Sequence, residues 1–167
     1  MQHYRFIEDL DLQKTWVTIG SFDGIHSGHQ YLIRQMVQDA HENDAASVVI
    51  TFFPHPAVYL HKIKDPFYLT SPNEKLGYLQ NLGVDYVVTL EFNQDLGSMH
   101  ASNFIEKLSR HLGMQKLWVG QGFALGKGRE GNTSYLQKIS HAYHYQLNII
   151  DPIQIGERNI SSTLIRD

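Results

Sequence analysis

The sequence contains no cysteine, which excludes disulfides, thiolate nucleophiles and cysteine-ligated metal centres. It has no apolar run near the roughly 20 residues that a membrane-spanning helix requires. It also lacks a basic block, and its net charge is −3, so neither a nucleic-acid surface nor a membrane surface is indicated. The first residues do not form a signal peptide. We therefore expect a cytoplasmic protein that binds neither nucleic acid nor membrane.

The chain has 167 residues, of which 42% are hydrophobic and 19% are charged. This composition is ordinary for a globular protein, and the length suits one domain with one core. No linker, repeat or low-complexity segment divides the sequence. We expect a single domain over residues 1–167, and nothing in the sequence indicates its oligomeric state.

Short apolar runs alternate with helical patterns along the whole chain. The runs are rich in Val, Ile, Leu or aromatic residues and end at turn residues, as buried parallel strands do. The predicted strands are residues 16–19, 47–53, 85–90, 116–120 and 146–150. The predicted helices are residues 28–43, 73–82, 102–112 and 133–143. This order predicts an α/β fold with a Rossmann-like, doubly wound parallel sheet of about five strands.

Unusual segments follow four of these strands: residues 23–29, 54–56, 121–132 and 160–166. The carboxyl ends of parallel strands share one edge of a sheet, and ligands bind there, where the strand order switches. We therefore expect these segments to converge on one site.

The first segment contains the pattern His-x-Gly-His, with His26 and His29 at a predicted helix start. Backbone N–H groups there have no partner within the helix and attract phosphate. Imidazolium groups on the same helix face would add charge-assisted hydrogen bonds, and Gly28 would let the backbone approach a ligand closely. The alternative is an ordinary helix start whose histidines are incidental.

The other three segments are more ambiguous. Pro54 and Pro56 fix the backbone around His55, either to hold a ring against a planar ligand or to end a strand. The glycine-rich residues 120–132 suit a phosphate or a flat ring, or form a mobile loop, but they do not match a P-loop. Ser162, Thr163 and Arg166 could surround a triphosphate, whereas Ser161 or Ser162 could simply cap a helix.

The remaining histidines do not indicate a metal site. His141 and His144 have the same spacing as the first pair, but no third ligand accompanies them, so we expect them on a helix surface. Five more, in polar surroundings, are expected to be solvated (His3, His41, His61, His100 and His111).

Taken together, these motifs resemble the nucleotidyltransferase superfamily, marked by His-x-Gly-His and by Ser-Ser-Thr-x-Ile-Arg. More closely, the chain resembles the FAD synthetase (FMN adenylyltransferase) module of the bacterial bifunctional riboflavin kinase/FAD synthetase family. The similarity runs from about residue 15 to the end and includes residues 20–29, 51–56 and 161–166. The sequence differs from the family pattern at Gly122, Ala124 and Leu125, and no riboflavin kinase domain is present in it.

The resemblance implies transfer of AMP from ATP to FMN, which gives FAD and pyrophosphate with the help of Mg²⁺. It implies no metal held by the protein itself. The catalytic residues would be His26, His29 and Arg166. The ATP-binding residues would be Gly20, Phe22, Asp23, Gly28, His29, Ser161, Ser162, Thr163 and Arg166. The flavin-binding residues would be Pro54, His55, Pro56, Gln121, Phe123 and Asn132.

Two alternatives stay open. The chain could be a catalytically weak or inactive relative that binds nucleotide or flavin in a regulatory or partner-binding role. It could also be an enzyme of the same class with another small phosphate as acceptor. Gly122 favours the first alternative, because a polar side chain is missing there, while Phe22 and Pro54-His55-Pro56 argue against the second.

Overall fold

The computed structural model describes residues 1–64, 67–151, 154–155 and 158–159. Their main feature is a six-stranded sheet in the order β1-β4-β3-β2-β5-β8, in which every neighbouring pair is parallel. The strands are β1 (Gln2–Tyr4), β2 (Thr15–Ile19), β3 (Ala46–Phe53), β4 (Tyr86–Glu91), β5 (Met114–Gly120) and β8 (Gln146–Ile150). The predicted doubly wound fold is confirmed.

Five strands lie within two residues of their predicted bounds, but the sixth, β1, was not predicted. Residues 2–4 are Gln-His-Tyr and contain no apolar run. β1 pairs only with β4 at the outer edge of the sheet, through Gln2, His3 and Tyr4. An edge strand of this kind is stabilised by backbone pairing, which side-chain patterns do not reveal.

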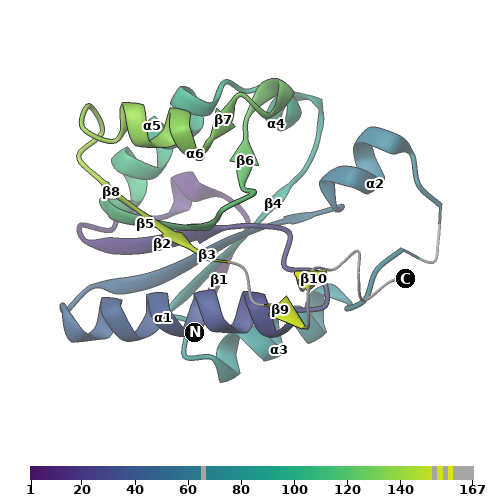
Figure 1. The fold of residues 1–167 in the computed structure, drawn as a ribbon, viewed down its shortest axis with the longest axis horizontal. Coiled ribbons are helices and arrows are strands. Elements are labelled where there is room, and N and C mark those ends of the chain that lie inside the picture. Colours follow the sequence, from purple (N-terminus) through teal and green to yellow (C-terminus); the bar gives the residue numbers. More distant parts are fainter. Residues whose placement is uncertain (65–66, 152–153, 156–157, 160–167) are drawn as a thin grey trace.

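Helices cover both faces of the sheet (Figure 1). One face carries α1 (Ser27–Glu42) and α3 (Pro72–Asn81), and the other carries α5 (Ala101–Leu112) and α6 (Thr133–Ile139). Two buried clusters follow from the alternation of side chains along each strand. Ile33 and Met36 of α1 pack in one cluster with Val49, whereas Leu108 of α5 packs in the other with Val17.

The order of the strands creates a switch point. From β2 the chain first moves outward through β3 to β4, and then returns to place β5 on the other side of β2. The connections that leave the carboxyl ends of β2 and β5 therefore flank one crevice, which is where ligands bind in open parallel sheets. These connections are residues 20–26 and 121–132.

One helix is shorter than predicted. The pattern predicted a helix over residues 133–143, but α6 ends at Ile139, and residues 140–144 form turns. The hydroxyl of Ser140 donates to the carbonyl oxygen of Gln137 at 2.7 Å, a local bond that competes with helix continuation. His141 and His144 are exposed on this turn, so their expected position on a helix surface was wrong.

Several short elements were not predicted from the sequence. Residues 121–132, expected to be a loop, contain a small antiparallel pair in which Leu125 lies opposite Gly131. No described helix is both long and apolar enough to cross a membrane. The short elements are η1 (Ile7–Asp9), α2 (Pro56–His61), α4 (Gln94–Gly97), β6 (Ala124–Leu125), η2 (Lys127–Arg129), β7 (Gly131–Asn132), β9 (Gln154–Ile155) and β10 (Arg158–Asn159).

Candidate functional site

The connection from β2 to α1 folds tightly around a buried phenylalanine. Gly20 continues the strand pairing, since its N–H donates to the carbonyl oxygen of Ile50 at 3.0 Å. The ring of Phe22 lies so close that a Cβ added to Gly20 would be 2.9 Å from its Cζ atom. Phe22 is buried, has a positive φ of 48° and contacts the ring of His29 edge-on at 5.1 Å. A larger residue at position 20 would therefore clash with the Phe22 ring. That ring in turn packs against His29.

Asp23 ties this connection to a distant segment. Its carboxylate is buried and accepts hydrogen bonds from the N–H groups of Leu69 and Thr70, at 3.0 and 3.1 Å, and from the Thr70 hydroxyl at 3.3 Å. The N–H of Gly24 in turn donates to the same hydroxyl at 3.2 Å. A buried carboxylate is stable only when such donors replace its hydration. In the described structure, Asp23 therefore holds the loop after β2 against Leu69 and Thr70. Its expected contact with ATP stays a prediction.

A buried lysine holds the loop from the other side. The Nζ atom of Lys75 donates to the carbonyl oxygen of Ser21 at 2.7 Å and to the hydroxyl of Thr51 at 3.1 Å. Burial lowers the pKa of Lys75 to about 8, although the nearby Asp23 carboxylate acts in the opposite direction. The ammonium group connects α3, β3 and the loop in one polar network.

The two histidines lie together at the start of α1. His26 is the N-cap residue, and its Nδ1 atom accepts from the N–H groups of Gly28 and His29 at 3.1 and 3.3 Å. An accepting Nδ1 assigns the proton of the neutral ring to Nε2. The two rings stack with their centroids 3.6 Å apart. The sequence correctly placed the pair at a helix start, but it did not predict that His26 would satisfy two of the N–H groups expected to face phosphate.

The protonation of the pair also differs from the prediction. Burial lowers the pKa of His26. Burial first, and then the neighbouring His26, lower the pKa of His29 to about 3. The expected imidazolium donors are therefore neutral imidazoles near pH 7 in the free protein. The Nδ1 atom of His29 is buried and has no hydrogen-bond partner within the described part of the chain, which makes it a candidate contact for a ligand.

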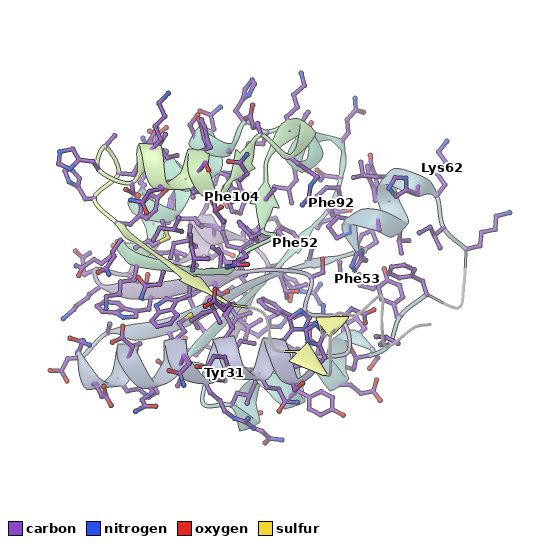
Figure 2. All side chains as sticks on the ribbon, in the orientation of Figure 1. Tyr31, Phe52, Phe53, Lys62, Phe92 and Phe104 are labelled. Atoms are coloured by element: carbon purple, nitrogen blue, oxygen red, sulfur yellow. The ribbon has the colours of Figure 1, made fainter. Side chains whose placement is uncertain are left out.

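A cavity of about 440 Å³ opens beside this loop. Gly20 and Ser21 form part of its wall, and four phenylalanines from separate parts of the chain also line it. Figure 2 shows three of them, Phe52, Phe92 and Phe104, toward the side of the sheet that carries α5. Phe52 and Phe92 contact edge to face at 5.9 Å. The fourth is Phe123, in the segment after β5. Pockets of this size and lining accept flat aromatic ligands.

His55 and Pro56 also line this cavity, and their expected contact with a planar ligand stays a prediction. His55 is the N-cap of α2, and its Nδ1 atom accepts from the N–H of Ala57 at 3.0 Å. Its own N–H donates to the hydroxyl of Tyr68 at 2.9 Å. The Phe53–Pro54 peptide bond is cis, and Pro54 is not part of the cavity wall described here.

Two expected flavin-binding residues make other contacts. The side chain of Gln121 donates to the carboxylate of Asp151 at 2.7 Å. The side-chain oxygen of Asn132 accepts from the N–H of Tyr135 at 2.9 Å and caps α6. Neither residue lines the aromatic cavity. Their expected contacts with flavin stay predictions.

The last predicted segment lies outside the described residues. It contains Ser161, Ser162, Thr163 and Arg166. We expected this segment to lie beside His29, and this stays a prediction because the described residues do not include the segment.

Several residues at the site were not singled out as site residues from the sequence. Phe52 lies at the end of β3, and Phe92 directly follows β4, so the strand-end rule used for other segments would have found both. Lys75 carried no such signal, because a lysine on a helix is normally exposed. Within the described ranges, no three His, Asp or Glu side chains are arranged to hold a metal ion.

Comparisons with known proteins agree with this architecture. The chain is 36% identical over 151 residues to the bifunctional riboflavin kinase/FMN adenylyltransferase of Escherichia coli K12, covering 90% of this chain and 48% of that protein. It is 33% identical over 157 residues to the protein of the same name from Haemophilus influenzae, covering 93% of this chain and 51% of the relative. The chain thus spans about half the length of these curated relatives.

A solved structure supports the fold independently of close sequence similarity. The crystal structure of a macrolide-efflux protein from Streptococcus pneumoniae superposes with a TM-score of 0.83, at 24% identity, over 98% of this chain and 54% of that one. At this identity the likeness concerns the fold alone. The model of the family described as FAD synthetase matches residues 8–164. The chain therefore belongs to the FAD synthetase family.

Proposed function

We propose that this chain is an FMN adenylyltransferase, which transfers AMP from ATP to the phosphate of FMN and releases pyrophosphate. The observation that carries the proposal is an aromatic cavity at the switch point whose wall, at Gly20 and Ser21, continues into the stacked pair His26 and His29. An aromatic cavity suits the flavin ring, and imidazole donors suit the phosphates. Membership of the family and the names of the relatives support the same reaction.

In the proposed reaction, a phosphate oxygen of FMN attacks the α-phosphorus of ATP. The new phosphorus–oxygen bond forms as the bond to the oxygen that bridges the α- and β-phosphates breaks, and its electron pair leaves with pyrophosphate. No covalent bond to the protein is needed, so the protein contributes positioning and charge stabilisation. The proposed division gives the cavity to the flavin and the histidines to the phosphates.

His26 would donate from Nε2, because its Nδ1 atom already accepts two backbone N–H groups. The buried Nδ1 of His29, which lacks a described partner, would contact a phosphate oxygen after taking up a proton. A triphosphate would favour this protonation, since nearby negative charge raises the pKa of an imidazole. Because the rings stack at 3.6 Å, we expect only one of the two to be charged at a time.

Mg²⁺ is part of the proposal as a partner of ATP. The described residues contain no set of three acidic or histidine side chains arranged around a metal. An ion held by the phosphates would neutralise charge on the leaving pyrophosphate. The residues proposed to hold the β- and γ-phosphates are Ser161, Ser162, Thr163 and Arg166.

We propose one adenylyltransferase domain over residues 1–167, and its cytoplasmic location stays a prediction.

The test is an assay with ATP, Mg²⁺ and FMN that follows FAD and pyrophosphate by chromatography. We expect turnover, and we expect His29→Ala to lower kcat by about 10²–10³-fold, the usual loss for a group that stabilises transition-state charge. His26→Asn retains a short side chain that can cap the helix but removes the Nε2 donor, so it separates capping from chemistry. His141→Ala, on the exposed turn after α6, is the matched control.

Each outcome of this assay separates the proposal from its alternatives. Tight binding of FMN or ATP without product would contradict it and favour a regulatory binding protein. Turnover with a different phosphate acceptor, but not with FMN, would change the substrate and keep the reaction class. Equal activity of a folded His29→Ala variant and the wild type would contradict the proposed role of His29 in the reaction.

A further inference from the structure

A second cavity, of about 200 Å³, lies at the same carboxyl edge of the sheet. Its wall includes Thr51 of β3 and Thr89 of β4, whereas Phe52 lines the aromatic cavity. Since successive side chains of a strand point to opposite faces, the two cavities lie on opposite sides of the sheet. The second is also lined by His3 of β1, by Arg5 just after that strand, and by the start of α3.

The charge of this second cavity is one-sided. Among the residues that the structure describes, His3, Arg5 and Lys75 line it, and no aspartate or glutamate does. Within the described part of the chain, neither Arg5 nor Lys75 takes part in an ion pair. The nearest acidic residue along α3, Glu74, accepts from the N–H of Ser71 at 2.7 Å in the capping box of that helix. The buried Asp23 carboxylate partly offsets the charge of Lys75, but Arg5 has no described ion-pair partner, so the cluster attracts an anion.

The remaining groups suit an oxyanion. The Nε2 atom of His3 and the hydroxyl of Thr89 are 2.8 Å apart, so both belong to one polar cluster. Burial, and then the Arg5 guanidinium, lower the pKa of His3, which shows that the positive charge of Arg5 reaches the imidazole. The cavity is smaller than the range of about 300–1,000 Å³ that holds drug-sized ligands. A nucleotide or a flavin is therefore too large for it.

We propose that this cavity binds a small phosphate-type oxyanion through Arg5, His3 and Lys75, at a site separate from that for ATP and FMN. The guanidinium of Arg5 offers paired N–H donors that match phosphate geometry. Lys75 contributes a buried positive charge and connects the two sites, because its ammonium also donates to the carbonyl oxygen of Ser21. An anion bound here is thus one hydrogen bond away from the loop that lines the aromatic cavity.

The test is a titration of the full chain with inorganic phosphate at constant ionic strength, with chloride as the balancing ion. The signal is the NMR resonance of the Cε1 proton of His3, assigned with His3→Gln. We expect a saturable shift and, at saturation, a higher pKa of His3, because a bound anion favours the imidazolium. Arg5→Gln should weaken binding about tenfold or more, since it removes charge-assisted hydrogen bonds.

The matched control is Arg34→Gln, which removes an exposed arginine of α1 whose described hydrogen bond is to Gln30. It should leave the phosphate affinity unchanged. His29→Ala should do the same, because the proposed anion site does not depend on the transfer reaction. A second titration with glycerol phosphate distinguishes a free phosphate from the phosphate group of a larger metabolite, and binding of either supports the site.

Three results would overturn the proposal. One is a shift of the His3 resonance that grows linearly with phosphate and never saturates. Another is an Arg5→Gln variant that keeps its native spectrum and binds phosphate as tightly as the wild type. The third is a shift that disappears in His29→Ala and persists in Arg5→Gln, because phosphate would then be binding at the histidine pair.

Discussion

The loop after β2 and the segment after β5 flank the same switch point, but they are built in different ways. Residues 20–26 contain buried Phe22 and Asp23, and Lys75 holds the loop through the Ser21 carbonyl. Residues 121–132 are largely exposed, and a Cβ added at Gly122 would meet no atom within 4 Å. The first is a preorganised wall, whereas the second has room to adapt to a ligand. Substitutions at the buried residues of the first should therefore cost stability, whereas a substitution at Gly122 should mainly change binding.

The largest expected effect is that of Asp23→Ala. The substitution leaves the N–H groups of Leu69 and Thr70 without their carboxylate acceptor. We expect the free energy of unfolding to fall by about 3 kcal/mol, because unsatisfied buried donors cost 1–3 kcal/mol each and relaxation recovers part of that. Urea unfolding measures the change. Gln121→Ala, at an exposed position after β5, is the control and should shift stability by less than about 0.5 kcal/mol.

A pH-dependent contribution from Lys75 is the next largest effect. Its pKa is about 8 in the folded chain and 10.5 when unperturbed, so the unfolded state binds more protons between these values. The Lys75 contribution to stability must therefore rise with pH from about 8 to 10.5, by up to about 3 kcal/mol.

Lys75→Met isolates this contribution. The variant should show a flatter rise in unfolding free energy than the wild type between about pH 8 and pH 10. Working below pH 10 keeps Tyr145 out of the measurement, because burial raises the pKa of its phenol above the ordinary value. Parallel curves for the two proteins would mean that Lys75 is hydrated in the folded chain, and the loop after β2 would then be less tightly held than its contacts indicate.

These contacts also explain which parts of the fold and of the site could be predicted from the sequence alone. The five predicted strands and four long helices follow from apolar periodicity, which a buried sheet between two helical layers enforces. The position of His26 and His29 follows from the turn after β2. That His26 caps its own helix does not follow, because the same sequence permits the ring to turn toward a ligand. β1 was missed for a different reason, since its pairing depends on backbone bonds to β4.

The aromatic cavity could not be predicted from the sequence, because its lining depends on how distant segments fold together. Phe52, Phe92, Phe104 and Phe123 come from four separate parts of the chain, and only the strand order brings them together. Phe52 at the end of β3, and Phe92 and Phe123 soon after β4 and β5, indicate the shared edge, but not which side chains face one another. The lining by Phe104 could not be predicted, because it belongs to the apolar stripe of α5 that also packs in the core.

A smaller effect is expected at Asn132, where the sequence predicted a flavin contact and the structure shows a helix cap. Asn132→Ala removes the acceptor for the N–H of Tyr135 and should lower the unfolding free energy by about 1 kcal/mol. Asn132→Asp, which retains the acceptor, should be nearly neutral. Titration of both variants with FMN separates the two roles. A loss of FMN affinity in Asn132→Asp that exceeds its loss of stability would favour direct contact with flavin.

The smallest change in stability is expected at Gly122, where the contrast between the two regions is sharpest. Gly122 lines the aromatic cavity and has open space around it, so Gly122→Asn should alter the unfolding free energy by less than about 0.5 kcal/mol. The new amide can donate to a flavin oxygen, and one such bond strengthens binding roughly threefold to tenfold. Fluorescence titration with FMN measures this gain, and Gly128→Asn, outside the cavity, is the control. A destabilised Gly122→Asn with unchanged FMN affinity would mean that the segment after β5 is as closely packed as the loop after β2, and the distinction between a fixed wall and an adaptable one would be lost.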